Sequence, residues 1–191
     1  MAAPDGTSIL NMTGTWSLNS SLSDDLSPTF MAQNIPWIIR QVISYASLEL
    51  KMVQKEPEPP ERLTTMIDVK QTVRPGGFDT ENSYILDGEE RTAKVPIFGA
   101  ISMRAVYVPM SEVSKEDIMG NIVEEPSTTD KRVAIKEMTE GVNTGWKTTA
   151  LWAFQEIDGE RRFCKYCTTT NGKGEEKVQA RLVYDYKASS E

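Results

Sequence analysis

The chain has 191 residues, of which 39% are hydrophobic and 26% charged, and its net charge is −7, as expected for one soluble domain. Its basic residues are scattered, which argues against nucleic acid or an anionic membrane as a partner, because both require a concentrated basic surface. The chain contains no histidine. The commonest general base and metal ligand are therefore missing, and we expect no metal or other cofactor.

The first residues carry neither the positive nor the apolar region of a signal peptide, and no apolar run approaches the roughly 20 residues that span a bilayer. We therefore expect a cytoplasmic protein without membrane insertion. Residues 1–12 are assigned to a flexible N-terminus. The sequence leaves the oligomeric state open.

The first regular elements are a strand and two short helices. Residues 13–19 alternate as a strand, and the helices are expected within about residues 23–47. Hydroxyl and acidic residues at 23–25 are typical of a helix start. Asn34 can cap the second helix, with Pro36 in its first turn, where a missing N–H costs nothing. Apolar residues recur along the second helix with helical spacing, so we expect it to be strongly amphipathic.

Sequential strands are expected from residue 47 to residue 187. Three tight turns are indicated by Asp-Gly or Asn-Gly pairs, which suit positive φ, at residues 87–88, 158–159 and 171–172. Two segments interrupt the strand pattern, a proline-rich loop at 56–61 and a long acidic loop at about 109–131.

This order of elements predicts a mainly β fold, a single antiparallel up-and-down β-barrel over residues 13–187, followed by a tail at 188–191. The two helices are expected near the barrel mouth. Closing the strands into a barrel removes the open sheet edges, and a barrel of this size can enclose one small ligand.

The pattern resembles the calycins, and above all the intracellular fatty-acid-binding proteins. In both, a "GTW" first strand is followed at once by two short helices and then by sequential strands. The loops at 56–61 and 109–131 have no counterpart in these compact carriers. The stretches "WSLNSSLSDD", "GWKTTALWAFQEIDGERR" and "RLVYDYK" are also similar to fungal lipocalin-like proteins.

The resemblance implies two functions. Related calycin-like folds in fungal natural-product pathways include cofactor-free cyclases, among them Diels–Alder-type enzymes. We therefore favour a cofactor-independent cyclase or isomerase, for example a pericyclase, that binds a hydrophobic small molecule in the barrel during secondary-metabolite biosynthesis. The alternative is a non-catalytic intracellular carrier of a lipid-like ligand.

Cys164 and Cys167 form a C-x-x-C motif within a predicted strand. A zinc site needs about four ligands, and the chain has neither further cysteines nor histidines. Residues three apart on a strand point to opposite faces. We therefore expect two reduced thiols, one inside the barrel and one outside.

Large apolar side chains are the candidates for ligand contact. Trp16 is expected to be structural, in the barrel floor. Trp37 lies on the second helix, where it either contacts a ligand or is an ordinary packed or surface-exposed residue. The methionines suit an adaptable cavity and are equally good core filler. The candidate ligand-binding residues are Trp37, Met52, Met66, Met103, Tyr107, Trp152, Phe154 and Leu182.

An inward-facing charge would be the clearest sign of a site, because a buried charge is costly unless it is paired. The candidates are Arg104, Asp68, Lys70, Glu137 and Lys165. Both faces of several of these strands are mixed, so alternation does not decide, and the solvated outer face is favoured for each.

The last predicted strand lacks the ligand handle of the fatty-acid carriers. In those proteins an inward Arg-x-Tyr binds the ligand carboxylate, whereas here Arg181 is followed two places later by Val183. Alternation sends Tyr184 and Tyr186 inward and Arg181 and Asp185 to solvent. The candidate catalytic residues are therefore Tyr184 and Tyr186, as hydrogen-bond donors without positive charge.

Overall fold

The computed structural model describes residues 1–60, 63–114 and 133–188. The strands are β1 (Gly14–Leu18), β2 (Ser47–Lys55), β3 (Met66–Arg74), β4 (Thr80–Ile85), β5 (Arg91–Val95), β6 (Gly99–Pro109), β7 (Val133–Gly141), β8 (Lys147–Ile157), β9 (Glu160–Thr170) and β10 (Lys177–Lys187). The helices are α1 (Ser27–Ala32), α2 (Trp37–Ser44) and the 3₁₀ turn η1 (Met110–Glu112). Most of the long loop expected at 109–131 lies outside the described residues.

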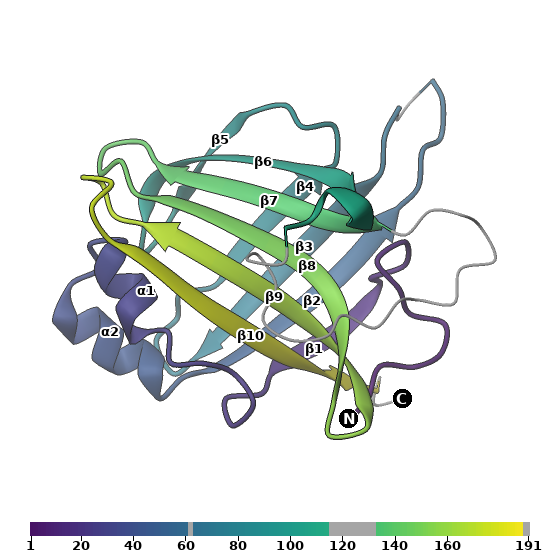
Figure 1. Ribbon diagram of the computed structural model, residues 1–191, viewed down its shortest axis with the longest axis horizontal. Coiled ribbons are helices and arrows are strands. Elements are labelled where there is room, and N and C mark those ends of the chain that lie inside the picture. Colours follow the sequence, from purple (N-terminus) through teal and green to yellow (C-terminus); the bar gives the residue numbers. More distant parts are fainter. Residues whose placement is uncertain (61–62, 115–132, 189–191) are drawn as a thin grey trace.

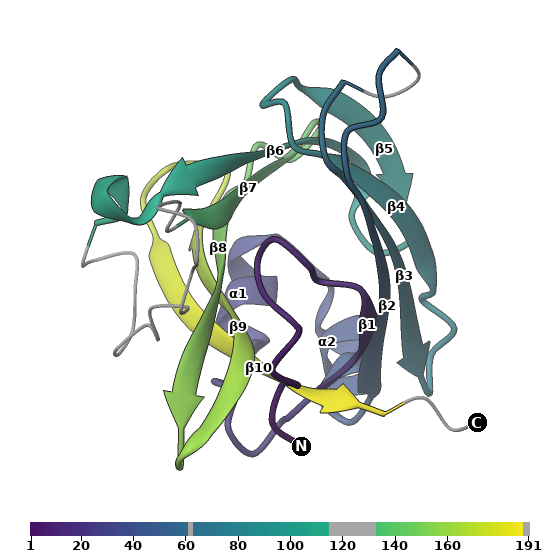
Figure 2. The same ribbon diagram turned by 90° about the vertical axis from the view of Figure 1, so that its right-hand side faces the viewer.

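The described strands form one antiparallel sheet in the order β4-β3-β2-β1-β10-β9-β8-β7-β6-β5. Figures 1 and 2 show that this sheet curls into a barrel, with the first strand beside the last. Its edge strands β4 and β5 leave a seam, which an isolated bridge between Asp87 and Val106 crosses. The predicted up-and-down barrel is confirmed, except that it is nearly closed rather than closed.

The expected hairpin at Asp87–Gly88 is wrong. This turn connects β4 to β5, but those strands are the two edges of the sheet and do not pair with each other. The Arg91 guanidinium reaches back to the Asp87 carboxylate at 2.7 Å, so this side-chain pair stabilises the turn. At residues 158–159 the hairpin is confirmed, and both Asp158 (φ 54°) and Gly159 (φ 74°) have the positive φ that a two-residue turn requires.

The two helices lie at one end of the barrel, as expected (Figure 1). Their starts differ from the sequence interpretation: α1 begins at Ser27, whose N–H is accepted by the Asp25 carboxylate at 2.8 Å. Asn34 does not cap α2 but forms the left-handed turn between the helices, at φ 61°. Asparagine tolerates this conformation better than most residues do. No described helix is long and apolar enough to span a bilayer.

Residues 1–13 fill the opposite end of the barrel. Figure 2 looks into this end, where the N-terminal chain loops inside the ring of strands. Ile9 and Met12 are buried in the inner core, and the Trp16 indole N–H donates to the Met12 carbonyl at 3.1 Å. This corrects the expectation of a flexible N-terminus, because a barrel end without helices needs another apolar cover.

Apolar side chains are buried on both sides of the barrel wall. The inner core contains Trp16, Trp152, Phe154 and Phe163, each no more than 1% exposed. A second cluster lies on the outer side of β8, β9 and β10, where Leu22 and residues of η1 and its neighbours cover it. Its buried members are Ala134, Leu151, Ala153, Cys164, Tyr166 and Val183.

Candidate ligand-binding site inside the barrel

An ion pair faces the barrel interior. Lys165 alternates with Phe163 and Cys167, which belong to the inner core, and its ammonium lies 3.4 Å from the Glu137 carboxylate. The two side chains are only 14% and 13% exposed. The sequence favoured the solvated outer face for both residues, and the structure corrects this.

Three neutral donors surround Glu137 in addition to Lys165. The Trp152 indole N–H donates to one carboxylate oxygen at 2.8 Å, and the Tyr84 and Thr139 hydroxyls each donate to the other oxygen at 3.3 Å. These hydrogen bonds give partners to both oxygens of a carboxylate that is almost excluded from solvent, as a buried ion pair requires.

Lys165 also lies over an aromatic face. Its ammonium is 3.8 Å from the centroid of the Trp152 ring, a cation–π distance. An ammonium has three N–H donors, and Glu137 is the only hydrogen-bond acceptor found for it among the described residues. Lys165 can therefore donate a hydrogen bond to an oxygen of a bound molecule.

The two tyrosines of β10 face inward, as alternation predicted. Tyr184 stacks on Phe163, with ring centroids 5.0 Å apart, and burial raises its phenol pKa well above the usual value. The phenol therefore stays protonated at neutral pH. None of the described residues forms a hydrogen bond with its hydroxyl, which remains available as a donor. Tyr186 packs edge-on against Trp16.

Arg181 and Asp185 face outward but are only partly exposed, which corrects the second half of that prediction. The Arg181 guanidinium donates to the Gln155 side chain at 3.3 Å, and the Asp185 carboxylate accepts from Asn19 at 2.8 Å. The chain between β1 and α1 crosses this part of the wall and covers both residues. Neither can reach a ligand inside the barrel.

The structure brings most of the predicted ligand-binding residues to the interior. Met52, Trp152, Phe154 and Leu182 are buried in the inner core, Tyr107 borders it, and Met103 packs in an adjoining cluster with Trp146. Two do not belong to this group. Trp37 is 65% exposed on α2. Met66 lies on the outer face of β3, because its neighbours Ile67 and Val69 face inward.

The remaining candidate residues have ordinary structural positions, as the sequence favoured. Cys164 and Cys167 lie on opposite faces, and burial raises their thiol pKa values to about 11 and about 12. Arg104 is exposed on the outside. Asp68 forms a partly exposed ion pair with Lys55, and Lys70 forms an exposed ion pair with Glu81.

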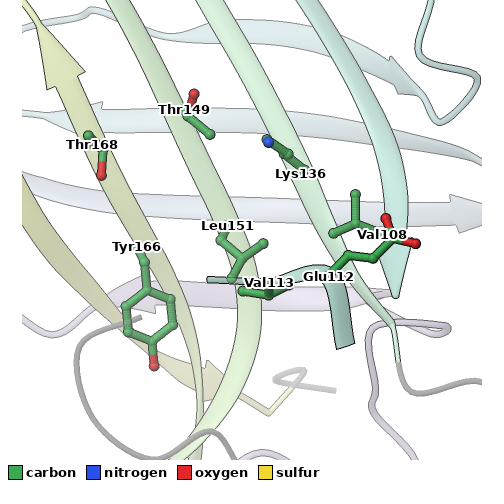
Figure 3. A pocket seen from close by; sticks show the side chains of 8 residues that line it. All are labelled: Val108, Glu112, Val113, Lys136, Thr149, Leu151, Tyr166 and Thr168. Atoms are coloured by element: carbon green, nitrogen blue, oxygen red, sulfur yellow. The ribbon is translucent and has the colours of Figure 1, made fainter. Parts of the chain in front are cut away.

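A hollow lies on the outer side of the wall (Figure 3). Its side chains come from β6 to β9 and from η1 and its C-terminal neighbour: Val108, Glu112, Val113, Lys136, Thr149, Leu151, Tyr166 and Thr168. Lys136 and Glu137 are adjacent in sequence but point to opposite faces of β7, so the sheet separates this hollow from the inner ion pair. We place the candidate site inside, where charged and aromatic groups converge.

Comparisons with known proteins bear on the fold and on the sequence as a whole. No protein-family model matches the chain. Among solved structures, the REP1-NXSQ fatty acid transporter has a TM-score of 0.60 over 94% of this chain and 98% of its own, at 12% identity. A Schistosoma mansoni fatty acid binding protein in complex with arachidonic acid has a TM-score of 0.58 at 12% identity, over 95% and 100%. The chain therefore shares the fold of these fatty-acid-binding proteins.

Two curated proteins resemble this chain over nearly its whole length. A probable pericyclase of Mollisia scopiformis is 25% identical over 186 residues, 97% of this chain and 94% of the relative. A pericyclase of Acremonium sp is 26% identical over 188 residues, 97% of each chain. The chain is thus similar in sequence to fungal pericyclases and similar in fold to fatty-acid-binding proteins.

Sequence reasoning missed the inner Lys165–Glu137 pair, although one signal pointed to it. A two-residue turn at Asp158–Gly159 pairs Ile157 with Glu160, and that register places Lys165 opposite Trp152. Directly opposite residues share a face of the sheet. The predicted inward position of Trp152 therefore implied an inward Lys165.

Proposed function

We propose that this β-barrel protein is a cofactor-independent cyclase or isomerase of the pericyclase type, acting on a hydrophobic small molecule inside the barrel in secondary-metabolite biosynthesis. The observation that carries the proposal is the inward Lys165–Glu137 pair in contact with Trp152 and Tyr84. Simple enclosure of an apolar ligand does not require a buried ion pair, which is costly to desolvate.

The chemistry fits these groups. A pericyclic step exchanges π and σ bonds within the substrate and needs no added reductant, oxidant or base. A Lys165 N–H donated to a conjugated carbonyl oxygen would withdraw electron density and stabilise the charge that develops in the transition state. The aromatic rings of Trp152, Phe163 and Tyr184 would hold the carbon skeleton in its reactive conformation, which lowers the entropic part of the barrier.

Glu137 and the phenols have supporting roles in this scheme. Glu137 holds the Lys165 ammonium in place through the ion pair, so that another of its N–H groups can donate to the ligand. Tyr184 stacks on Phe163, and its hydroxyl, which has no hydrogen-bond partner among the described residues, offers a second donor that is neutral. Lys165 was not among the residues proposed from sequence for catalysis, and it supplies the positive charge that Tyr184 and Tyr186 lack.

A carrier is the second candidate. The similarity in fold to fatty-acid-binding proteins supports it, and a carrier would use the same interior without turnover. The absence of an inward arginine on β10 argues against a carboxylate handle of the kind found in those carriers, and the donors near Lys165 suit a carbonyl equally well.

The test compares reaction rates of polyene or polyketide-derived precursors that carry a conjugated carbonyl and cyclise slowly on their own. The wild-type protein should accelerate cyclisation, and Lys165→Met should lose roughly 100-fold of that acceleration, as expected for removal of one oxyanion-stabilising donor. Tyr184→Phe should have a smaller effect.

Lys136→Met is the matched control, because Lys136 lies on the outer side of the same wall. This variant should accelerate cyclisation as much as the wild-type protein does. Binding of these precursors without acceleration of any of them would support the carrier and contradict the cyclase.

A further inference from the structure

Two polar residues occupy the buried face of α1. Thr29 and Gln33 are one helical turn apart and only 6% and 8% exposed, beside the buried Ala32. A short helix that packs on a barrel end gains most from apolar residues on this face. Buried polar side chains at these positions therefore need hydrogen-bond partners.

Gln33 meets the inner wall of the barrel. Its side-chain N–H donates to the Thr148 hydroxyl at 3.1 Å, and that hydroxyl lies 2.8 Å from the Thr169 hydroxyl. Thr148 is also paired across the sheet with Thr139, which donates to Glu137. A polar strip thus runs along the inside of the wall from α1 to the Lys165–Glu137 pair.

The strip is incompletely bonded at its helix end. The Gln33 carbonyl oxygen and the Thr29 hydroxyl are enclosed and have no hydrogen-bond partner within the described part of the chain. An enclosed acceptor without a donor destabilises the protein, and an apolar side chain of the same size would avoid that cost. Such a group is useful if a bound molecule supplies the missing donor.

We propose that Gln33 is a specificity-determining residue that accepts a hydrogen bond from a hydroxyl or N–H group of the ligand at the helix end of the barrel. The inference rests on the proposed binding of a hydrophobic molecule inside the barrel. It adds a substrate class: an apolar skeleton with a carbonyl near Lys165 and a hydrogen-bond donor near α1.

The test uses two probes that differ in one donor, 1-dodecanol and dodecyl methyl ether, titrated into the purified protein by calorimetry. The wild-type protein should bind the alcohol roughly three- to tenfold more tightly, as expected for one net hydrogen bond. Gln33→Leu should bind the two probes equally, and Gln33→Glu should retain or increase the preference for the alcohol.

Gln41→Leu is the matched control, because Gln41 is exposed on α2, and it should keep the wild-type preference. Circular dichroism establishes that each variant is folded. Equal affinities of the wild-type protein for the two probes, including no detectable binding of either, would overturn the inference, as would an unchanged preference in folded Gln33→Leu.

This experiment is independent of turnover. A preference for the alcohol that depends on Gln33, in a protein without cyclase activity, would sustain the inference and contradict the proposed enzyme. Acceleration of cyclisation without that preference would contradict only the role of Gln33.

Discussion

At the scale of single residues, Glu137 and Lys165 determine the chemical character of the interior. Each would be strongly disfavoured there alone, and each is acceptable because the other is 3.4 Å away and further donors bind the carboxylate. Such a pair contributes little net stability compared with apolar residues of similar volume. Its retention inside an apolar core is therefore better explained by function than by folding.

This reasoning predicts a strong coupling between the two residues. Glu137→Gln should lower the free energy of unfolding by about 3 kcal/mol, because it leaves the Lys165 charge buried without a counter-ion. The double variant Glu137→Gln with Lys165→Met should regain a large part of that loss. Urea unfolding of the single and double variants measures the coupling as a double-mutant cycle.

Glu140→Gln provides the comparison, because Glu140 and Lys147 form an exposed ion pair on the neighbouring strands. Its effect should stay within about 0.5 kcal/mol. Strictly additive effects at Glu137 and Lys165 would show that the ion pair does not determine the stability of the interior.

At the scale of elements, the seam between β4 and β5 depends on a turn rather than on a ladder of backbone hydrogen bonds. Asp87 accepts bidentate hydrogen bonds from Arg91 at 2.8 and 2.7 Å and also bonds the Glu89 N–H. The Arg91 hydrogen bond is the main reason why the pKa of Asp87 falls from 3.8 to about 2. The folded state thus favours the ionised carboxylate.

The sign of the pH dependence follows from that shift. Because the pKa is lower in the folded state than in the unfolded state, the contribution of Asp87 is complete above its ordinary pKa of 3.8 and declines as the pH falls toward 2. Asp87→Asn should therefore be less stable than the wild-type protein at pH 6, with a difference that shrinks between pH 4 and pH 2. Thermal unfolding of both proteins across this range checks it, and a difference independent of pH would contradict the assignment.

At the scale of the whole molecule, the barrel is covered at both ends by the chain itself. The helices cover one end, and residues 1–13 fill the other, with Met12 fully buried against Trp16. A ligand that enters the interior would therefore have to pass the helix end or the seam. The N-terminal segment belongs to the core rather than to a disordered tail.

Met12→Ala should accordingly lower the free energy of unfolding by about 2–4 kcal/mol, the usual cost of a large-to-small change in a core. Leu10→Ala is the control two residues away, since Leu10 is 42% exposed and should have little effect. Urea unfolding distinguishes them. Similar small losses for both variants would show that the N-terminal segment does not form part of the cooperative core.

The sequence predicted the barrel well because the relevant signals are local. Turn residues such as Asp158–Gly159 and the period-two pattern of a strand each depend only on residues close in sequence. The order of these signals along the chain predicts an up-and-down barrel. The hairpin at Asp87–Gly88 failed for a related reason, since a turn signal cannot tell whether the strands on either side of it will pair. That outcome depends on where the sheet closes.

The site was harder to predict because the alternation of apolar and polar residues identifies the inward face of a strand only when its outward face is polar. On β9, Cys164 and Tyr166 are buried outside under Leu22 and its neighbours, while Phe163 and Cys167 lie inside, so both faces are apolar. The sequence pattern of β9 therefore did not show which face Lys165 occupies. On β10, where Leu182 and Tyr184 contrast with Arg181 and Asp185, alternation gave the correct faces.

By itself, then, the sequence determined the class of fold, the helix pair, the hairpin at Asp158–Gly159 and the inward tyrosines, because these follow from local turn chemistry and periodicity. The predicted tight turn at Asn171–Gly172 is instead a loop over residues 171–176, in which Gly174 rather than Gly172 has a positive φ. Only the tertiary structure decided that Glu137, Lys165 and Gln33 meet the interior and that the N-terminal segment fills one end. Those placements depend on cross-strand register and on which segments cover each face, and both arise from contacts between residues far apart in the chain.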